Sequence, residues 1–263
     1  MLRNCFYCFM FLLVSCASLK PPGWPRSTET TGTAYYQQAA AMNWQERDSI
    51  TKGLVLNGNM PDFLRRFVPV RVKTYDSIQG KQVRLIFWVS LDYLSVGTNS
   101  DWARVHVSAR LAQQIVDSLN CFLPTTKMVD LIYRAAKVKL APVPMYAFRD
   151  STPTFWQHHL IVEGQRKGRK GLIAGIQKDI VQTNKLPPNQ KNERVAIYGW
   201  HRLNGIPIQP LYTGHAWWYV DYSHGVRLIY ERLRVNGKWM HYKEVLNSPV
   251  LRKMICDEEN RSD

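Results

Sequence analysis

The sequence predicts an α+β fold in which several helices pack on a mostly antiparallel sheet within a single domain. Segments with strand character follow one another from about residue 67 onward, and helical segments interrupt them early. Two Asn-Gly pairs, Asn204-Gly205 and Asn236-Gly237, lie between such segments, and Asn-Gly is the strongest short-range signal of a β-hairpin. About 230 residues follow the N-terminal region, which suits one domain with one core.

The N-terminus has the layout of a secretory signal. Arg3 precedes an apolar run over residues 5–14, and this run is far shorter than the roughly 20 apolar residues that span a bilayer. The sequence Leu13-Val14-Ser15-Cys16 resembles the lipobox of bacterial lipoproteins. That resemblance implies that Cys16 is lipidated and becomes the mature N-terminus. The alternative is a buried N-terminal helix, but neither an amphipathic period nor a cap accompanies the run.

Three segments follow from this interpretation. We expect a lipoprotein signal peptide over residues 1–15, a flexible tether over 16–33 that is rich in Pro, Gly, Ser and Thr, and a single α+β domain over 34–263. The protein is then an exported bacterial membrane lipoprotein that faces the periplasm or the cell surface.

The charge of the chain favours an anionic partner. Lysine and arginine number 35 against 20 acidic residues, which gives a formal net charge of +15. A lipid surface or an acidic envelope polymer fits this charge, whereas export makes nucleic acid an unexpected partner. The densest basic run, QRKGRK over residues 165–170, is interpreted as a solvated loop between a helix and a strand.

The cysteines divide between the signal and the domain. Cys121 and Cys256 are the two that remain in the domain once the signal and the lipidation site are set aside. In an oxidising compartment two such thiols either pair or stay apart, and the sequence leaves both alternatives open.

The first half of the domain alternates helices and strands. Residues 34–47, with their Ala and Gln content, predict a helix, and strands are expected over 67–75, 84–97 and 102–108. Ser108 is a good N-cap for a helix whose apolar positions recur at Leu111, Ile115 and Leu119. A second helix is expected over about 126–136, and a third opens at Ser151-Thr152-Pro153 and runs to about residue 163.

The second half consists mostly of strands. GLIAGI over 171–176, VAIYGWH over 195–201, VRLIYERLRV over 226–235 and KWMHYKEV over 238–245 all have strand character, and Ser248-Pro249 begins a last short helix. Gln177-Lys178-Asp179 follow the first of these strands and are interpreted as ordinary surface residues. Lys127, Asp130 and Arg134 are interpreted as an exposed row of ion pairs.

The stretch GHAWWYVDYSHG over 214–225 carries the main site candidates, His215, Asp221 and His224. On a straight strand His215 and Asp221 share a face but lie about 20 Å apart. Asp221 and His224 converge only if the chain bends, which Gly225 permits. The alternative is a structural network in which Asp221 binds backbone amides and His224 binds a tyrosine hydroxyl.

His201 ends a strand just before the Asn204-Gly205 turn, and we expect it to border the same sheet edge as His215. Two imidazoles and a carboxylate have the atom types for zinc or for acid/base chemistry near neutral pH. The spacing H-E-x-x-H is absent from the sequence, and C-x-x-C does not occur in the predicted domain. We therefore expect no metal and no cofactor, with zinc as the alternative.

Cys121 precedes the helix expected near residue 126, and His215 follows later at a strand. This order resembles the NlpC/P60 group of papain-like cell-wall peptidases. The resemblance implies that Cys121 is the nucleophile and His215 its base. The alternative for Cys121 is a small buried hydrophobic residue.

A second resemblance covers residues 87–251. The blocks LPTTKMVDLIY, KVKLAP, VAIYGWHRLNGIPIQPLYTGH and VDYSHGVRLI together resemble a family of secreted bacterial proteins of uncharacterised activity. This resemblance implies export and a single domain, and it implies no reaction.

Taken together, these features favour a lipid-anchored cell-envelope hydrolase that acts on peptidoglycan or a related extracellular polymer. The alternative is a non-catalytic glycan-binding or structural lipoprotein of the envelope. The candidate catalytic residues are Cys121, His201, His215, Asp221 and His224, and the candidate substrate-binding residues are Trp200, Trp217, Trp218 and Tyr222.

Overall fold

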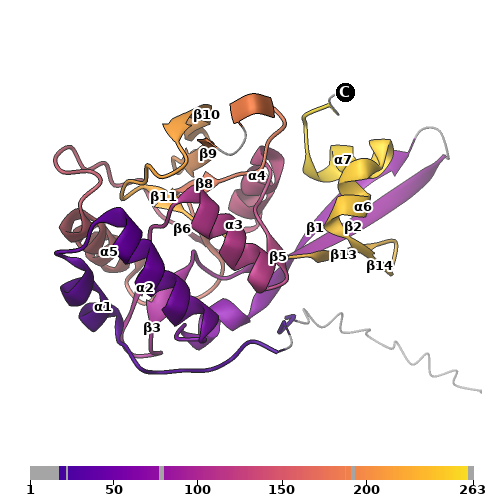
Figure 1. Cartoon of the computed structure of the whole chain (residues 1–263). Helices are drawn as coiled ribbons and strands as arrows, with labels where there is room; N and C mark the ends of the chain where they lie inside the picture. The colour runs from indigo at the N-terminus through magenta and orange to yellow at the C-terminus, as the bar shows by residue number, and fades with distance from the viewer. Residues whose placement is uncertain (1–17, 22, 77–79, 187, 191–192, 260–263) are drawn as a thin grey trace, which may run out of the picture.

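The computed structural model describes residues 18–21, 23–76, 80–186, 188–190 and 193–259. It confirms the α+β class, with helices packed on mostly antiparallel sheets (Figure 1). The predicted signal peptide and Cys16 lie outside the described residues. None of the described helices combines the length with the hydrophobicity that a membrane-spanning segment requires.

A six-stranded sheet forms one half of the molecule. Strands β1 (Phe67–Asp76) and β2 (Lys81–Ser90) pair along their whole length. The other edge of β2 binds β12 (Ile229–Tyr230) and β13 (Arg232–Val235), and β14 (Lys238–His241) and β5 (Cys121–Phe122) complete the sheet. The helices α4 (Thr126–Ala135), α6 (Tyr242–Asn247) and α7 (Pro249–Ile255) contribute to the same core as this sheet (Figure 1).

A four-stranded sheet forms the part of the molecule that carries the site. Its order is β10 (Pro207–Ala216), β9 (Arg194–His201), β8 (Lys178–Ile180) and β11 (His224–Gly225). The pair of β11 with β8 is parallel and sets His224 opposite Lys178. Two short pairs lie outside both sheets, β3 (Ser95–Gly97) with β4 (Trp102–Arg104) and β6 (Val138–Lys139) with β7 (Ile173–Ala174).

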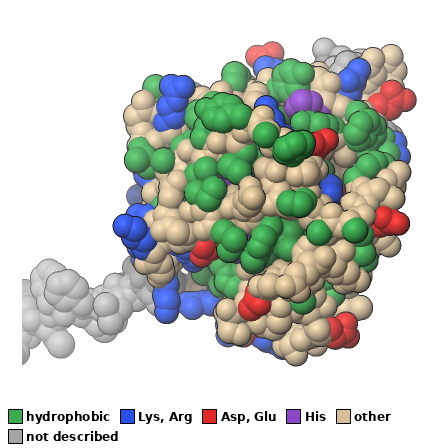
Figure 2. Space-filling model, turned by 90° about the vertical axis from the view of Figure 1, so that its left-hand side faces the viewer, with side chains coloured by type: hydrophobic (Ala, Val, Ile, Leu, Met, Phe, Trp, Pro, Cys, Tyr) green, Lys and Arg blue, Asp and Glu red, His purple; other side chains and the backbone are tan. Residues whose placement is uncertain are grey.

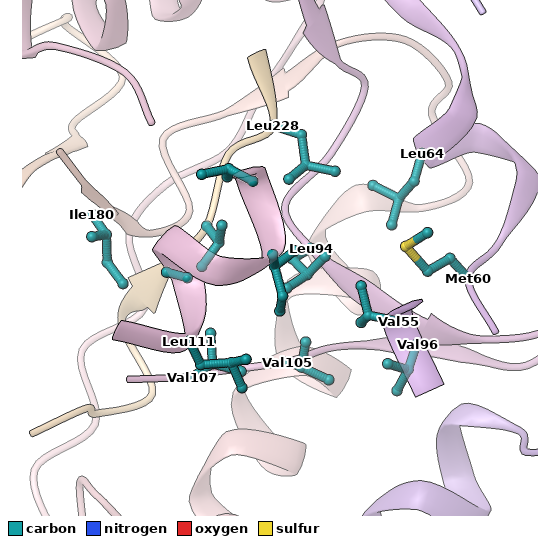
Figure 3. Close-up of a cluster of buried hydrophobic side chains, with 14 of the residues drawn as sticks. Val55, Met60, Leu64, Leu94, Val96, Val105, Val107, Leu111, Ile180 and Leu228 are labelled. Atoms are coloured by element: carbon teal, nitrogen blue, oxygen red, sulfur yellow. The ribbon is translucent and has the colours of Figure 1, made fainter. Parts of the chain in front are cut away.

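The remaining helices enclose the main hydrophobic core. They are α1 (Gly32–Ala39), α2 (Trp44–Leu56), α3 (Ala109–Ser118) and α5 (Thr152–Arg166), with short 3-10 turns at Asp62–Arg65 and Pro188–Gln190. Figure 3 shows side chains from α2, α3, β3 and β8 meeting in this core, among them Val55, Leu111, Val96 and Ile180. The core therefore ties the helical half directly to the strand β8 that carries Lys178.

Local signals in the sequence predicted several boundaries correctly. The Ser108 side chain accepts a hydrogen bond from the Leu111 N–H at 3.3 Å and begins α3. Ser151 caps α5, with proline in the first turn. Both Asn-Gly pairs form the expected turns, between β9 and β10 and between β13 and β14.

Other boundaries differ from the predictions. The single helix expected over 34–47 is two helices, because Asn43 forms a capping box with Glu46 and starts α2 afresh. Packed structure also begins ahead of residue 34: the Leu19 N–H donates to the Phe67 carbonyl at 2.9 Å, and Trp24 packs edge-on against Phe67. The described part of the expected tether thus lies against the domain.

Candidate functional site

The stretch 214–225 is not a straight strand. Strand β10 ends at Ala216, and two turns follow, in which the Tyr219 N–H donates to the Ala216 carbonyl at 3.0 Å and the His224 N–H donates to the Asp221 carbonyl at 3.1 Å. The straight-strand geometry, in which His215 and Asp221 lie about 20 Å apart, is therefore excluded, and the chain bends as the alternative required. The rings of His215 and His224 lie with their centroids 5.7 Å apart.

Gly225 is needed for close packing rather than for the bend. It lies in β11 opposite Asp179. A Cβ at this position would meet Gln177 Oε1 at 2.4 Å and Tyr93 Cδ1 at 2.5 Å. The parallel pairing that sets His224 beside Lys178 thus requires glycine here.

Asp221 is a buried carboxylate, 1% exposed, at the centre of this region. Its Oδ1 accepts hydrogen bonds from the Ser223 N–H at 2.8 Å and the Ser223 hydroxyl at 2.5 Å, and its Oδ2 pairs with Arg149 Nη2 at 2.8 Å. Burial by itself raises the pKa of Asp221. The neighbouring His224, the Ser223 hydrogen bonds and Lys178 have the larger combined effect and lower the pKa to about 2. Asp221 is therefore ionised at neutral pH.

Asp221 does not bind His224 directly. The distance from His224 Nε2 to Asp221 Oδ1 is 3.8 Å, which exceeds the hydrogen-bond range that a dyad needs. Burial lowers the pKa of His224 to about 3, although the Asp221 charge opposes this shift. The buried His224 imidazole is therefore neutral at pH 7 and does not pair with Asp221 as an acid/base dyad.

Lys178 is the cation that the sequence analysis missed. Gln177, Lys178 and Asp179 are all buried, which corrects their interpretation as surface residues. The Lys178 N–H donates to the Ser223 carbonyl at 2.6 Å, and its Nζ lies 5.4 Å from the Trp200 ring centroid. Burial lowers the pKa of Lys178, and the Asp221 charge counteracts part of this effect.

His215 is the imidazole of this cluster that reaches the surface. It is partly exposed, and its ring contacts those of Tyr212 and Tyr219 with centroids at 4.9 and 4.4 Å. Burial lowers the pKa of His215 below 6.5, against the opposing effect of Asp221. His215 is therefore a neutral base at pH 7, within the electrostatic influence of Asp221, Lys178 and Arg149.

Three fully buried histidines lie behind this surface. His106 Nδ1 donates to the His224 carbonyl at 2.7 Å, and the His158 ring packs edge-on against Tyr222 at 5.0 Å. Within the described residues, His106 Nε2, His158 Nε2 and both ring nitrogens of His224 have no hydrogen-bond partner. Burial lowers the pKa of His106 to about 4 and that of His158 to about 3.

The predicted aromatic residues divide between core and surface. Trp200 and Tyr222 are 5% and 1% exposed, so they do not face a substrate as predicted. Trp217 and Trp218 do reach the surface, where Trp218 stacks on Trp44 with ring centroids 6.3 Å apart. Trp217 and Trp218 therefore remain as surface aromatic residues, whereas Trp200 and Tyr222 belong to the core.

Tyr222 has a structural role instead. Its hydroxyl accepts a hydrogen bond from the Met145 N–H at 2.8 Å, and its own N–H donates to the Arg149 carbonyl at 3.0 Å. These bonds fix the loop over residues 141–150, which places the Arg149 side chain on Asp221.

Cys121 does not join the site. It lies in β5 of the six-stranded sheet, paired with Tyr230, and it is 3% exposed. Its Sγ donates to the Leu119 carbonyl at 3.4 Å, and burial raises the pKa of the thiol well above its usual value. A buried thiol of raised pKa is a poor nucleophile, so the role implied by the peptidase resemblance is corrected. Cys121 and Cys256 are both free thiols.

His201 forms a different pair. Its Nε2 binds Asp130 Oδ1 at 2.8 Å, and its ring stacks on Tyr133 with centroids 4.5 Å apart. His201 and His215 lie at opposite ends of the β9–β10 pair, because His201 is opposite Pro207 and His215 is opposite Val195. His201 therefore does not line a common cleft with His215.

The sequence held only part of the information about these residues. Lys178 follows an apolar strand-like run, which is a signal for a site residue, but no sequence pattern identified Arg149 or Tyr219. Over the described ranges, no group of three or more His, Cys, Asp or Glu side chains is arranged to hold a metal ion. No family model, curated protein or solved structure matches the chain.

Proposed function

We propose that the chain is a lipid-anchored cell-envelope hydrolase that acts on peptidoglycan or a related extracellular polymer, with His215 as its general base. One observation carries the proposal: the partly exposed His215 imidazole lies 5.7 Å from the His224 ring and within the electrostatic influence of the buried Asp221 and of two cations, Lys178 and Arg149. A base with a pKa below neutrality and adjacent positive charge are what hydrolysis by an activated water requires.

The proposed reaction is the cleavage of an amide or ester bond. His215 accepts a proton from a water molecule while the water oxygen bonds to the carbonyl carbon and the carbonyl π electrons move to its oxygen. Arg149, whose side chain is 45% exposed, stabilises that oxyanion, and the buried Lys178 adds positive charge behind it. The carbonyl then re-forms, the bond to the leaving group breaks, and the His215 imidazolium returns its proton to the leaving group. Asp221 holds Arg149 in place and stabilises the imidazolium.

A cavity that Tyr219 separates from the proposed base offers room for one unit of the polymer. It measures about 290 Å³ and lies between the start of α2, the start of α5 and the segment Trp218–Val220. Tyr219 both lines this cavity and contacts the His215 ring. Trp44 and Trp218 supply flat faces on which a sugar ring stacks. Figure 2 shows hydrophobic side chains spread over the face that carries α1 and α5, with charged ones mainly toward its edges.

The second candidate function is a glycan-binding module without catalysis. The stacked pair of Trp44 and Trp218 favours it, because exposed aromatic faces bind sugars without any reactive group. In that case Asp221, Lys178 and Arg149, which surround His215, serve only to hold the loop over residues 141–150.

Turnover of purified peptidoglycan distinguishes the two functions. The wild-type protein should release soluble fragments, detected by mass spectrometry, and His215→Gln should reduce the rate at least about a hundredfold because it removes the base. The profile of kcat/KM against pH should fall on the acidic side with a midpoint below 6.5, the direction in which burial shifts the His215 pKa. Lys178→Met should also lose activity, and Lys170→Met, a matched change in the exposed basic run, should not. Binding to the polymer without fragment release at any pH from about 5 to 8 would favour the binding module instead.

Cys16→Ala should release the protein from membranes, because a lipid on Cys16 is the expected anchor. The measurement is the distribution of the protein between membrane and soluble fractions after a high-salt wash. Cys8→Ala, within the predicted signal, is the matched control and should leave the protein in the membrane fraction. A Cys16→Ala protein that stays with the membranes would show that the lipoprotein assignment is wrong.

A further inference from the structure

A second cavity lies at the far end of β9, on the side where His201 pairs with Asp130. It measures about 400 Å³ and is bounded by α4, by β6 and by the turn that joins β9 to β10. Arg134 of α4, Lys139 of β6 and Asn204 of the turn all line it, together with His201. The proposed hydrolytic site uses none of these residues.

The walls of this cavity are held together by specific contacts. The Tyr133 hydroxyl donates to the Arg202 carbonyl at 2.7 Å, which ties α4 to the turn. The Tyr133 ring stacks on His201 with an interplanar angle of 16°, and the Lys139 Nζ lies 5.0 Å from the centre of the same ring. The cations are thus presented by fixed elements rather than by free loops.

The charges in the cavity are not balanced. Asp130 also lines the cavity, and it accepts hydrogen bonds from His201 Nε2 at 2.8 Å and from the Tyr198 hydroxyl at 3.0 Å, so its oxygen atoms are bound while one negative charge remains at the wall. Across the described residues, neither Arg134 nor Lys139 forms an ion pair with a carboxylate. This corrects the exposed ion-pair row expected for Lys127, Asp130 and Arg134, since Lys127 pairs with Asp257 and Asp130 with His201. Two positive charges therefore face the cavity against one carboxylate, and neither cation forms an ion pair with it.

We propose that this cavity binds a small phosphate-bearing anion. A phosphate group suits the two cations, which outweigh the Asp130 carboxylate, with the planar guanidinium of Arg134 suited to two phosphate oxygens and Lys139 acting as a point charge. The Asn204 amide supplies a neutral donor at the same cavity. Inorganic phosphate and the terminal phosphate of an ester share this chemistry, and the cavity has room for either.

The test uses the full-length protein in detergent, with inorganic phosphate and glycerol 3-phosphate as probes at constant ionic strength. The imidazole resonances of His201 report on binding, because its ring forms part of the cavity wall. We expect saturable shifts with a dissociation constant on the order of 1 mM or lower. Tighter binding of glycerol 3-phosphate identifies an ester as the ligand class, and equal or weaker binding identifies free phosphate.

The paired variant Arg134→Gln/Lys139→Gln should weaken phosphate binding at least tenfold. Lys167→Gln/Lys170→Gln removes the same charge from the exposed basic run and is the matched control, which should bind phosphate as the wild type does. Shifts that fail to saturate, or that weaken equally in the two paired variants, would overturn the proposal by showing only a general response to charge.

Discussion

Lowering the pH from 7 to 5 should destabilise the folded protein by about 5 kcal/mol. Burial lowers the pKa of four histidines far below the usual 6.5, to about 4 in His106, about 3 in His158 and His224, and about 2 in His159. These side chains stay neutral in the folded state at pH 5, whereas they take up protons in the unfolded chain. The unfolded state then binds more protons, so stability falls as the pH drops below 6.5.

Two carboxyl groups oppose this trend but do not cancel it. Burial raises the pKa of Asp179 to about 6 and also raises that of Asp48, so each binds its proton more readily in the folded state. On unfolding at pH 5 the four histidines take up protons and the two carboxyl groups release them, so the net uptake is about three protons. The free energy of unfolding then changes by about 4 kcal/mol per pH unit. Because domains are stable by only about 5–15 kcal/mol, the protein should lose a third or more of its stability between pH 7 and pH 5.

Denaturant titrations at several pH values between about 8 and 5 measure this slope directly. His158→Leu removes one buried imidazole of similar size and should reduce the slope by about one proton, or about 1.4 kcal/mol per pH unit. An unfolding free energy that stays constant from pH 7 to pH 5 would contradict the assignment of these histidines as neutral buried groups. The same slope in wild type and His158→Leu would exclude His158 from the set.

Local signals in the sequence predicted local structure well. Ser108, Ser151 and the two Asn-Gly turns each act through bonds within a few residues, and each begins or joins elements where it was expected to. The missed break at Asn43 is also local: the Asn43 and Glu46 pair fits a capping box, which the prediction of one helix overlooked.

The site could not be predicted in the same way, because it depends on pairing between distant segments. Lys178 meets His224 through the parallel pair of β8 and β11, and Arg149 reaches Asp221 from a loop that Tyr222 holds. No periodicity in the sequence encodes such contacts. The sequence also left open whether the stretch 214–225 runs straight or bends, and the turns after Ala216 bring His215 back toward His224.

Asp221→Asn should reduce turnover at least about a hundredfold and also lower the free energy of unfolding by about 1–3 kcal/mol. The asparagine Oδ1 still accepts hydrogen bonds from Ser223, but its NH2 group faces the Arg149 guanidinium, so two donors oppose each other. Arg149 then loses its charged partner, and the imidazolium of His215 loses the nearby negative charge that stabilises it. Activity and melting temperature should be measured on the same preparation.

Two further variants separate the catalytic loss from the structural one. Asp117→Asn changes an exposed carboxylate whose partner is Gln113, and it should leave both activity and stability unchanged. Arg149→Met removes the cation and leaves the Ser223 bonds to Asp221 in place, so it should lose activity with the smaller loss of stability expected for a half-exposed pair. If Asp221→Asn is destabilised but hydrolyses peptidoglycan at the wild-type rate, then Asp221 only holds the turn at Ser223. The stretch 214–225 would in that case be a structural element, and the glycan-binding function would be favoured.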